Sequence, residues 1–246
     1  MNTLDFILDL IYPPACLSCG ELQIIGTKVP LCPACQAKWE ELRRSRCPVC
    51  KEAETVCACK PSLLSDLIRN LECVHLVPYE QFSVAGRLLL TAKDERYPRL
   101  TNFFADQLVE ALQMRGLLSE TDSACIAYLP RSAYRKANSG TDQAEALARA
   151  LGKRLQLPVV KAFSRHNAAM QKELSTEERL RSARRTYRLH KKLSLTEGQT
   201  VLLVDDIFTT GATMLAGAEL LRSRGAGRII CIAVGRSVDS SRKQKK

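Results

Sequence analysis

The stretch VLLVDDIFTTGAT, residues 201–213, decides how the rest of the sequence is interpreted. Its first four residues are apolar, which predicts a buried strand of a parallel sheet. Such a strand ends at the carboxyl edge of the sheet, where open α/β folds bind their ligands. The glycine and threonines at residues 209–213 then predict a loop and the start of a helix.

Two kinds of chemistry follow this predicted strand. Asp205 and Asp206 are adjacent acids, which suit a vicinal diol or a magnesium ion bound to it but would repel a phosphate alone. The loop that follows can bind an anion, because its hydroxyl groups and the backbone amides of a helix start donate hydrogen bonds. The loop residues are Thr209, Thr210, Gly211, Ala212 and Thr213. Acids directly before a phosphate loop predict a ribose that carries its phosphate.

Other phosphate-binding loops fit the sequence poorly. A Walker A loop needs a Gly-Lys-Ser/Thr ending, and the sequence contains none. A dinucleotide fingerprint is also absent, and Gly225 and Gly227 precede a predicted strand, which is typical of a helix cap. An ordinary strand-to-helix turn explains the threonines as helix caps but leaves the paired aspartates unexplained.

Strands and helices alternate around this stretch, which predicts an α/β domain with a parallel sheet flanked by helices. The predicted strands lie at residues 71–80, 125–130, 158–163, 201–206 and 228–235. The predicted helices end near Leu90, Gly116, Leu155 and Gly225. Residues 164–192 break the alternation with a polar, basic segment that is too long for an ordinary connection. We interpret this segment as a flap over the site.

Eight of the eleven cysteines lie in close pairs near the N-terminus. A C-x-x-C turn supplies two zinc ligands, and two such turns complete a tetrahedral site. The predicted ligands are Cys16, Cys19, Cys32, Cys35, Cys47, Cys50, Cys57 and Cys59. The spacing assigns the first four to one zinc ion and the last four to a second, although interleaved pairing also fits. Four thiolates leave no open coordination position, so the metal is predicted to be structural.

Disulfides, free thiols and an iron–sulfur cluster are the alternatives for these cysteines. Secreted disulfides would need a targeting signal, but the N-terminus lacks a basic region and its short apolar run carries Asp5 and Asp9. No apolar stretch reaches the roughly 20 residues that a membrane-spanning helix requires. We therefore expect a cytoplasmic protein with no membrane span. Cys73, Cys125 and Cys231 lie in apolar strands and are interpreted as core residues.

Composition divides the 246 residues into unequal parts. Residues 1–62 combine a short amphipathic helix with the cysteine module, which is too small to fold on apolar burial alone. Residues 63–236 form the α/β domain, and residues 237–246 form a disordered basic tail. The formal net charge of +11 would fall to +7 if two zinc centres, each of charge −2, form. The basic excess belongs to the α/β domain and suggests anionic partners.

The sequence resembles the ComF family, in which a zinc-binding cysteine module precedes a type I phosphoribosyltransferase-like domain. The resemblance spans nearly the whole chain. It rests on the PP-x-C-x-x-C pattern at residues 13–19 and on VLLVDDIFTTGAT, a motif for phosphoribosyl diphosphate. It implies magnesium as a cofactor and a role in natural competence, the uptake and processing of transforming DNA, with other competence proteins as partners.

The same resemblance implies further anion contacts at Lys93 and in a basic loop that contains Arg131, Arg135 and Lys136. The next motif of the family usually reads Arg-Gly-Phe-Asn-Gln. Residues 139–143 read Ser-Gly-Thr-Asp-Gln, which keeps the glycine and the glutamine but lacks the arginine.

The predicted flap follows the family in outline. Arg165, Gln171, Leu174 and Arg179 match it. Ser182 and Tyr187 stand where asparagine and phenylalanine are usual.

Two functions from different classes fit these features. As an enzyme, the domain would transfer a phosphoribosyl group, with Asp205 and Asp206 orienting the ribose while magnesium and the basic loop stabilise the departing diphosphate. As a non-catalytic competence protein, it would bind single-stranded or duplex DNA through residues 164–192, which hold nine Lys/Arg against three Glu, and through its tail. Solvated surface charge is the simpler explanation of each basic run. A regulator that senses nucleotide precursors is a third class, but no helix-turn-helix signature supports it.

Overall fold

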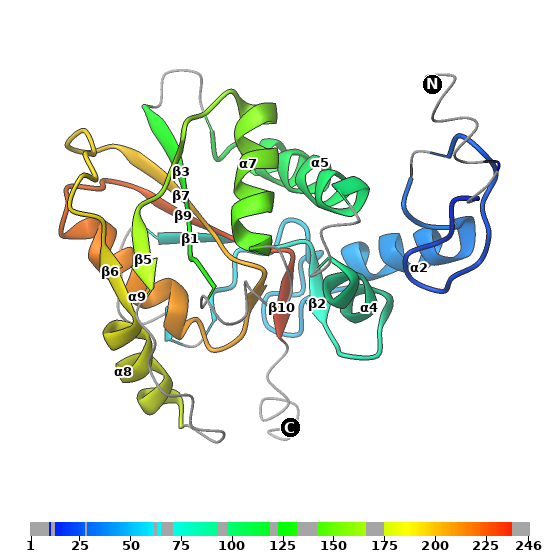
Figure 1. The fold of residues 1–246 in the computed structure, drawn as a ribbon. Helices are drawn as coiled ribbons and strands as arrows, with labels where there is room; N and C mark the ends of the chain where they lie inside the picture. Colours follow the sequence, from blue (N-terminus) through cyan, green and yellow to red (C-terminus); the bar gives the residue numbers. More distant parts are fainter. Residues whose placement is uncertain are drawn as a thin grey trace.

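Figure 1 shows the fold in a computed structural model of the chain, which describes residues 10, 13–27, 29–61, 63–64, 71–92, 98–118, 123–131, 142–165 and 175–237. The helices are α2 (Pro33–Arg44), α4 (Val84–Thr91), α5 (Pro98–Met114), α7 (Gln143–Leu155), α8 (Thr176–Thr186) and α9 (Ala212–Arg222). The strands are β1 (Leu71–Val74), β2 (Val77–Tyr79), β3 (Ala124–Tyr128), β4 (Val159–Val160), β5 (Phe163–Arg165), β6 (Tyr187–Leu189), β7 (Thr200–Val204), β8 (Ile207–Phe208), β9 (Ile229–Ile232) and β10 (Gly235–Ser237). The predicted leading helix, apart from residue 10, and the predicted tail, apart from residue 237, lie outside the described residues. Among the helices that the structure describes, none combines the length and the hydropathy of a membrane span.

The main sheet has the parallel order β1-β9-β7-β3-β4, which confirms the predicted α/β fold. Its central strand β7 is buried along its whole length. Alternate side chains of a strand point to opposite faces, so Leu202 and Val204 join one apolar cluster while Val201 and Leu203 join the other. Helices α5 and α7 cover the first face and α9 covers the second (Figure 1). The end of β7 therefore emerges between two packed layers.

Three strands of the main sheet continue, after a break, into a small parallel sheet of order β2-β10-β8. The prediction of single strands at residues 71–80 and 228–235 was wrong, because the first divides into β1 and β2 and the second into β9 and β10. Across the break these three segments keep the same neighbours, and Val234 N donates to Asp206 O while Leu76 N donates to Val234 O, both at 3.1 Å. β8 follows Asp206, so the small sheet is hydrogen-bonded to the chain that leads into the predicted phosphate loop.

The segment predicted as a flap contains regular structure. Strands β5 and β6 pair antiparallel, and helix α8 lies between them in the chain. Helix α8 begins with a capping box, in which Ser175 and Glu178 each accept a backbone hydrogen bond from the other. The helix packs against α9, where Arg184 Nε donates to Glu219 Oε2 at 2.8 Å. Residues 166–174 of the predicted flap lie outside the described residues.

The cysteine module packs against the α/β domain through helix α2. Trp39 is fully buried, and its ring centroid lies 5.5 Å from that of Phe103 and 5.7 Å from that of Phe104 in α5. Aromatic pairs of this kind contribute about 0.5–1.5 kcal/mol each beyond the area they bury. Arg43 of α2 also donates to Glu110 of α5 at 2.7 Å. The module is therefore docked onto the domain rather than tethered beside it.

Candidate functional site

Asp205 and Asp206 lie where the chain leaves β7, at the carboxyl edge of the main sheet. The neighbouring strand fixes their backbone, because Asp205 N donates to Ile232 O at 3.0 Å. Each carboxylate accepts a local amide hydrogen bond, from Asp206 N to Asp205 Oδ1 at 2.9 Å and from Ile207 N to Asp206 Oδ1 at 2.8 Å. Both side chains line the same cleft as the loop that follows. The structure therefore places two carboxylates where a ligand can reach them.

These two carboxylates lie close together, so their negative charges repel each other. Burial and the neighbouring Asp206 carboxylate raise the pKa of Asp205 well above its ordinary value. Arg131 forms an ion pair with Asp206, because its Nη2 atom lies 2.7 Å from Asp206 Oδ2. The charge of Asp205 is therefore the one that a bound cation, or the hydroxyl donors of a ligand, would stabilise most.

Residues 209–213 connect β8 to helix α9. Gly211 is the N-cap of α9 and has a φ of +83°, a conformation in which other residues are strained. Its lack of a side chain leaves the first amides of α9 without an N-cap acceptor, and Ala212 N makes only a long hydrogen bond of 3.4 Å to Thr210 Oγ1. Thr209, Thr210, Ala212 and Thr213 line the cleft beside the aspartates. A phosphate bound in front of α9 would satisfy these amides.

The loop rests on the chain segment that leaves the cysteine module. Leu63 N donates to Thr210 O at 3.3 Å. A Cβ atom at Gly211 would lie 2.9 Å from Leu64 Cγ and 3.0 Å from Pro61 Cβ, and Leu64 is fully buried. Glycine at position 211 is therefore required by the close packing as well as by its backbone conformation.

Arg131 follows β3 and is held by the start of helix α7. Its backbone N donates to Asp142 Oδ2 at 2.9 Å, and its Nη2 atom donates to Gln143 Oε1. Gln143 Nε2 in turn donates to Leu89 O at 3.0 Å in helix α4. Asp142 also caps α7 by accepting from Glu145 N. These bonds orient the guanidinium of Arg131 toward the aspartates.

A cleft of about 360 Å³ lies between the loop and the described part of the flap. The flap contributes Arg165 of β5, Arg179 and Ser182 of α8 and Tyr187 of β6 to its lining. Tyr187 is buried, and its hydroxyl accepts from Arg165 Nη1 at 3.2 Å and donates to Pro130 O at 3.5 Å. The cleft thus combines carboxylates, threonine hydroxyls and arginines, which suits a phosphorylated sugar.

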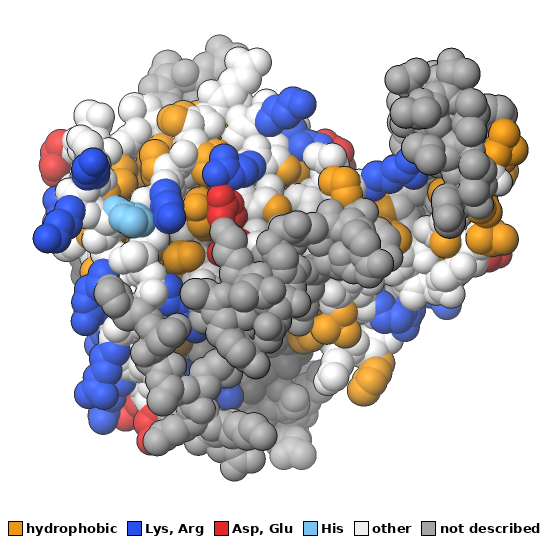
Figure 2. Space-filling model, in the orientation of Figure 1, with side chains coloured by type: hydrophobic (Ala, Val, Ile, Leu, Met, Phe, Trp, Pro, Cys, Tyr) orange, Lys and Arg blue, Asp and Glu red, His pale blue; other side chains and the backbone are white. Residues whose placement is uncertain are grey.

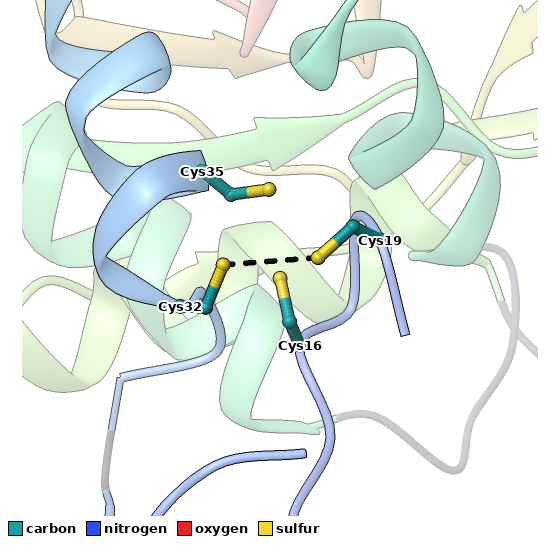
Figure 3. A group of neighbouring side chains, drawn as sticks. All are labelled: Cys16, Cys19, Cys32 and Cys35. Atoms are coloured by element: carbon teal, nitrogen blue, oxygen red, sulfur yellow. Dashed lines mark hydrogen bonds between the residues drawn. The ribbon is translucent and has the colours of Figure 1, made fainter. Parts of the chain in front are cut away.

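The eight predicted zinc ligands form two groups of four in sequence order. In the first group, Cys16 and Cys19 lie on a turn while Cys32 and Cys35 lie at the start of α2, and their sulfur atoms converge within 4.8 Å of one another (Figure 3). The Cys19 and Cys32 sulfur atoms are 3.7 Å apart. Tetrahedral zinc with Zn–S bonds of about 2.3 Å holds its sulfur ligands about 3.8 Å apart, so this group fits the ion.

The second group consists of Cys47, Cys50, Cys57 and Cys59, whose sulfur atoms also lie within 4.8 Å of one another. Burial opposes ionisation of Cys47, but hydrogen bonds from the Cys50 and Val49 amides and from a buried arginine outweigh it and lower the pKa of Cys47 to about 6. The thiolate is the form that binds zinc. The structure therefore groups the thiols sequentially and not in the interleaved manner.

Comparisons with known families agree with both parts of this geometry. The model of the phosphoribosyl transferase domain family matches residues 137–246, and that of the double zinc ribbon domain family matches residues 7–61. The chain is a phosphoribosyltransferase-like protein with an N-terminal zinc module. The first match includes the aspartates and the loop, and the second includes all eight grouped cysteines, which supports structural zinc.

Individual relatives match this phosphoribosyltransferase-like protein over limited stretches. A ribose-phosphate pyrophosphokinase of Parasynechococcus marenigrum (strain WH8102) is 53% identical over 36 residues, which are 15% of this chain and 11% of that protein. The chain therefore matches about a tenth of the length of this relative.

Solved structures with a likeness to the chain include two nucleobase phosphoribosyltransferases. The adenine phosphoribosyltransferase of Thermoanaerobacter pseudethanolicus is 20% identical, with 56% of this chain and 82% of that chain covered and a TM-score of 0.36. The hypoxanthine phosphoribosyltransferase of Staphylococcus aureus is 18% identical, with 57% and 73% covered and a TM-score of 0.34.

Some predicted residues are not placed, and some placed residues were not predicted. Lys93, Arg135 and Lys136 lie outside the described residues, so their expected anion contacts stay predictions. The sequence did not predict a buried cluster beside the second zinc group. Glu54, His75 and Arg236 form this cluster. No local pattern marks these three residues as partners.

Proposed function

We propose that this protein binds phosphoribosyl diphosphate with magnesium in the cleft between the loop and the flap, as a ComF-type protein. The observation that carries the proposal is that one cleft is lined by both acids and by four loop residues: Asp205, Asp206, Thr209, Thr210, Ala212 and Thr213. Adjacent acids beside an anion-binding helix start suit the hydroxyls of a ribose and its 5-phosphate. Arg131, next to Asp206, offers a guanidinium to a diphosphate.

Each of these groups has a proposed part in binding. The amides and hydroxyls of residues 209–213 hold the 5-phosphate, while Asp205 and Asp206 hold the ribose hydroxyls. The carboxylates also fit magnesium, which proteins usually bind through one or two carboxylates and the phosphates of the substrate. Magnesium would neutralise charge on the diphosphate. Arg131 stabilises the same part of the ligand.

Binding in this way prepares the ligand for transfer of its phosphoribosyl group. An acceptor forms a bond to the anomeric carbon while the bond from that carbon to the diphosphate oxygen breaks, and the electron pair leaves with the diphosphate. Negative charge grows on the leaving group, where the guanidinium of Arg131 stabilises it. Arg179 and Tyr187 of the flap line the cleft and would limit the access of water.

The proposed setting is natural competence in the cytoplasm. The resemblance to the ComF family supports the first part. The second is supported by the zinc-binding thiols, because a reducing compartment keeps such thiols available to the metal.

Isothermal titration calorimetry of the full-length, zinc-loaded protein with phosphoribosyl diphosphate tests the binding step. We expect binding that requires magnesium and weakens by at least roughly tenfold in the double variant Asp205→Asn/Asp206→Asn. Asp106→Asn, which changes an exposed carboxylate on α5, serves as the control and keeps the wild-type affinity. Unchanged binding in the double variant, or none in the wild type, contradicts the proposal. Diphosphate release with candidate acceptors then separates transfer from binding alone.

A second function, DNA binding without catalysis, is favoured by the charge of the flap. Helix α8 and strand β6 expose several arginines, and Figure 2 shows Lys and Arg side chains gathered along this edge of the molecule. The exposed residues are Arg181, Arg184, Arg185 and Arg188. Contact with several backbone phosphates predicts a steep loss of affinity with salt, so a flat salt dependence with single-stranded and duplex DNA would reject this function.

A further inference from the structure

The two zinc groups are backed by different parts of the phosphoribosyltransferase-type domain. The first group is backed by helix α4, where Arg87 Nε donates to Ser18 Oγ at 3.2 Å and Thr91 Oγ1 donates to Leu17 O at 3.3 Å. The second group is backed by strand β10, through Arg236. Strand β10 pairs with β8, the strand that leads into the phosphate loop. The second zinc group is therefore connected to the loop by a short path.

Arg236 makes the first connection. Its buried Nη2 atom lies 3.3 Å from Cys47 Sγ and donates to the two carboxylate oxygens of Glu54 at 3.0 and 3.1 Å. In the small sheet, Arg236 is the register partner of Phe208. Phe208 is buried and directly precedes Thr209, the first residue of the loop. Arg236 thus contacts a zinc ligand through its side chain and pairs with the entry of the loop through its backbone.

Glu54 completes a buried ionic cluster around Arg236. Glu54 and His75 are each 1% exposed, and His75 Nε2 lies 2.6 Å from Glu54 Oε2. Burial opposes ionisation of Glu54, but His75 and Arg236 outweigh it and lower the pKa of this carboxyl. Glu54, Cys57 and His75 are close enough to hold a metal ion of their own. Arg236 already supplies the positive charge there, so we assign the cluster to the arginine and not to a further ion.

The chain that leaves the second zinc group makes the other connection. Cys59, its last ligand, is followed by Pro61 and Leu64, which pack directly against Gly211. The distances to a Cβ atom at Gly211 leave no room for the loop to move toward this segment. Holding Cys59 on zinc therefore also holds the surface on which the loop rests.

We propose that the second zinc group positions the phosphate loop through Arg236 and through the segment after Cys59, whereas the first zinc group does not. This inference rests on the proposed function, in which the loop binds a phosphate. Zinc holds Cys47 and Cys59 at a fixed separation, and the two connections begin at these two ligands. Without that constraint the loop takes other conformations and loses affinity for a phosphorylated ligand. Arg236 is thus a positioning residue.

Two pairs of variants, with one member of each pair at each zinc group, test this inference in the full-length protein. Cys19→Ser and Cys50→Ser each remove the exposed second cysteine of a C-x-x-C turn, one from each zinc group. Arg87→Gln and Arg236→Gln each remove the arginine that backs one group and keep all eight thiols. Zinc content is measured by mass spectrometry. Affinity for phosphoribosyl diphosphate with magnesium is measured by calorimetry.

We expect Cys50→Ser and Arg236→Gln to weaken ligand binding by roughly tenfold or more, because the first weakens the zinc site that holds Cys47 and the second removes the buried ion pair with Glu54. Cys19→Ser and Arg87→Gln should weaken binding less than their counterparts, because their contacts are with α4, which is joined to Arg131 through Leu89 and Gln143. Arg236→Lys should restore most of the affinity, since its ammonium group keeps the charge and can donate to several acceptors. Equal losses within each pair, or no loss in Cys50→Ser and Arg236→Gln, overturn the inference.

Amide hydrogen exchange of residues 209–215 without ligand makes the test independent of the proposed function. Faster exchange in Cys50→Ser than in Cys19→Ser, and in Arg236→Gln than in Arg87→Gln, supports the inference even if the wild type binds no phosphoribosyl diphosphate. Failure of wild-type binding alone contradicts only the proposed function. If Cys50→Ser does not fold, the arginine pair decides, and identical exchange in its two members overturns the inference.

Discussion

Arg131 Nη2 donates a hydrogen bond of 2.7 Å to Asp206 Oδ2, which joins the residues that follow strands β3 and β7. The guanidinium therefore has an anionic partner before any ligand arrives. The same nitrogen contacts Gln143 Oε1, which keeps the guanidinium oriented while its anionic partner changes. A diphosphate entering the cleft would share Arg131 with Asp206, and a cation at the aspartates would ease that competition.

Replacing Arg131 with methionine should weaken binding of phosphoribosyl diphosphate more than binding of ribose 5-phosphate, which lacks the diphosphate. A hydrogen bond to a charged group contributes about 1.5–3 kcal/mol, so we expect a loss of roughly 10- to 100-fold for the diphosphate ester. Competition titrations with the two ligands measure the difference. Arg149→Met, on an exposed face of α7, should change neither affinity. An equal loss for the two ligands would remove the role assigned to Arg131.

Replacing Asp205 with asparagine should stabilise the ligand-free protein and weaken magnesium-dependent binding. Because burial and Asp206 raise the pKa of Asp205, the folded state binds this proton more tightly than the unfolded state does. The free energy of unfolding of the wild type therefore falls as the pH rises from the unfolded pKa, about 3.9, toward the raised folded value. Asparagine does not ionise, so at pH 7 we expect a gain on the order of 1 kcal/mol.

Urea unfolding of the wild type and of Asp205→Asn at several pH values measures this gain. The difference between the two proteins should be smallest in acid and should grow toward neutral pH. A variant that is less stable than the wild type at pH 7 would show that the ionised Asp205 carboxylate does not destabilise the folded protein.

Replacing Gly211 with alanine should destabilise the fold more than the same change at Gly198. Both glycines have positive φ, +83° and +76°, so each alanine costs about 1 kcal/mol of backbone strain. Gly198 faces open space, whereas a Cβ atom at Gly211 meets Pro61 and Leu64, which adds about 1–3 kcal/mol. Thermal unfolding of the two variants gives the comparison. Equal losses of stability would mean that the loop does not rest on this segment.

Replacing Arg184 with alanine should loosen helix α8 from helix α9. Arg184 forms an exposed ion pair with Glu219 of α9, and exposed pairs contribute about 0.2–1 kcal/mol. Arg181→Ala is the matched control, because Arg181 pairs with Glu177 inside α8 itself. Hydrogen exchange of residues 176–186 should become faster in the first variant than in the second. Equal exchange rates in the two variants would mean that the ion pair between Arg184 and Glu219 does not hold α8 against α9.

The parts of the site that could be predicted from sequence are local. The strand, Asp205, Asp206 and the loop follow one another in residues 201–213, so chain order alone brings them together. The zinc ligands could also be predicted, because a C-x-x-C turn places two cysteines at a short, fixed spacing. The structure adds how deeply each cysteine is buried, and it shows that the thiols are grouped in sequence order.

Features that depend on distant partners could not be predicted. Arg236 contacts Cys47 and Glu54, which lie more than 180 residues away in the chain. The breaks between β1 and β2 and between β9 and β10 leave the order and the register of these strands unchanged, and no local pattern predicts them. The start of α8 did have a signal, the capping box of Ser175 and Glu178.

A crystal structure of the protein grown with phosphoribosyl diphosphate and magnesium would show the ligand in the cleft. The 5-phosphate should contact the amides of residues 209–213, with the ribose hydroxyls at Asp205 and Asp206 and the diphosphate within reach of Arg131. A ligand bound elsewhere on the domain, or a cleft that stays empty at saturating ligand, would contradict this prediction.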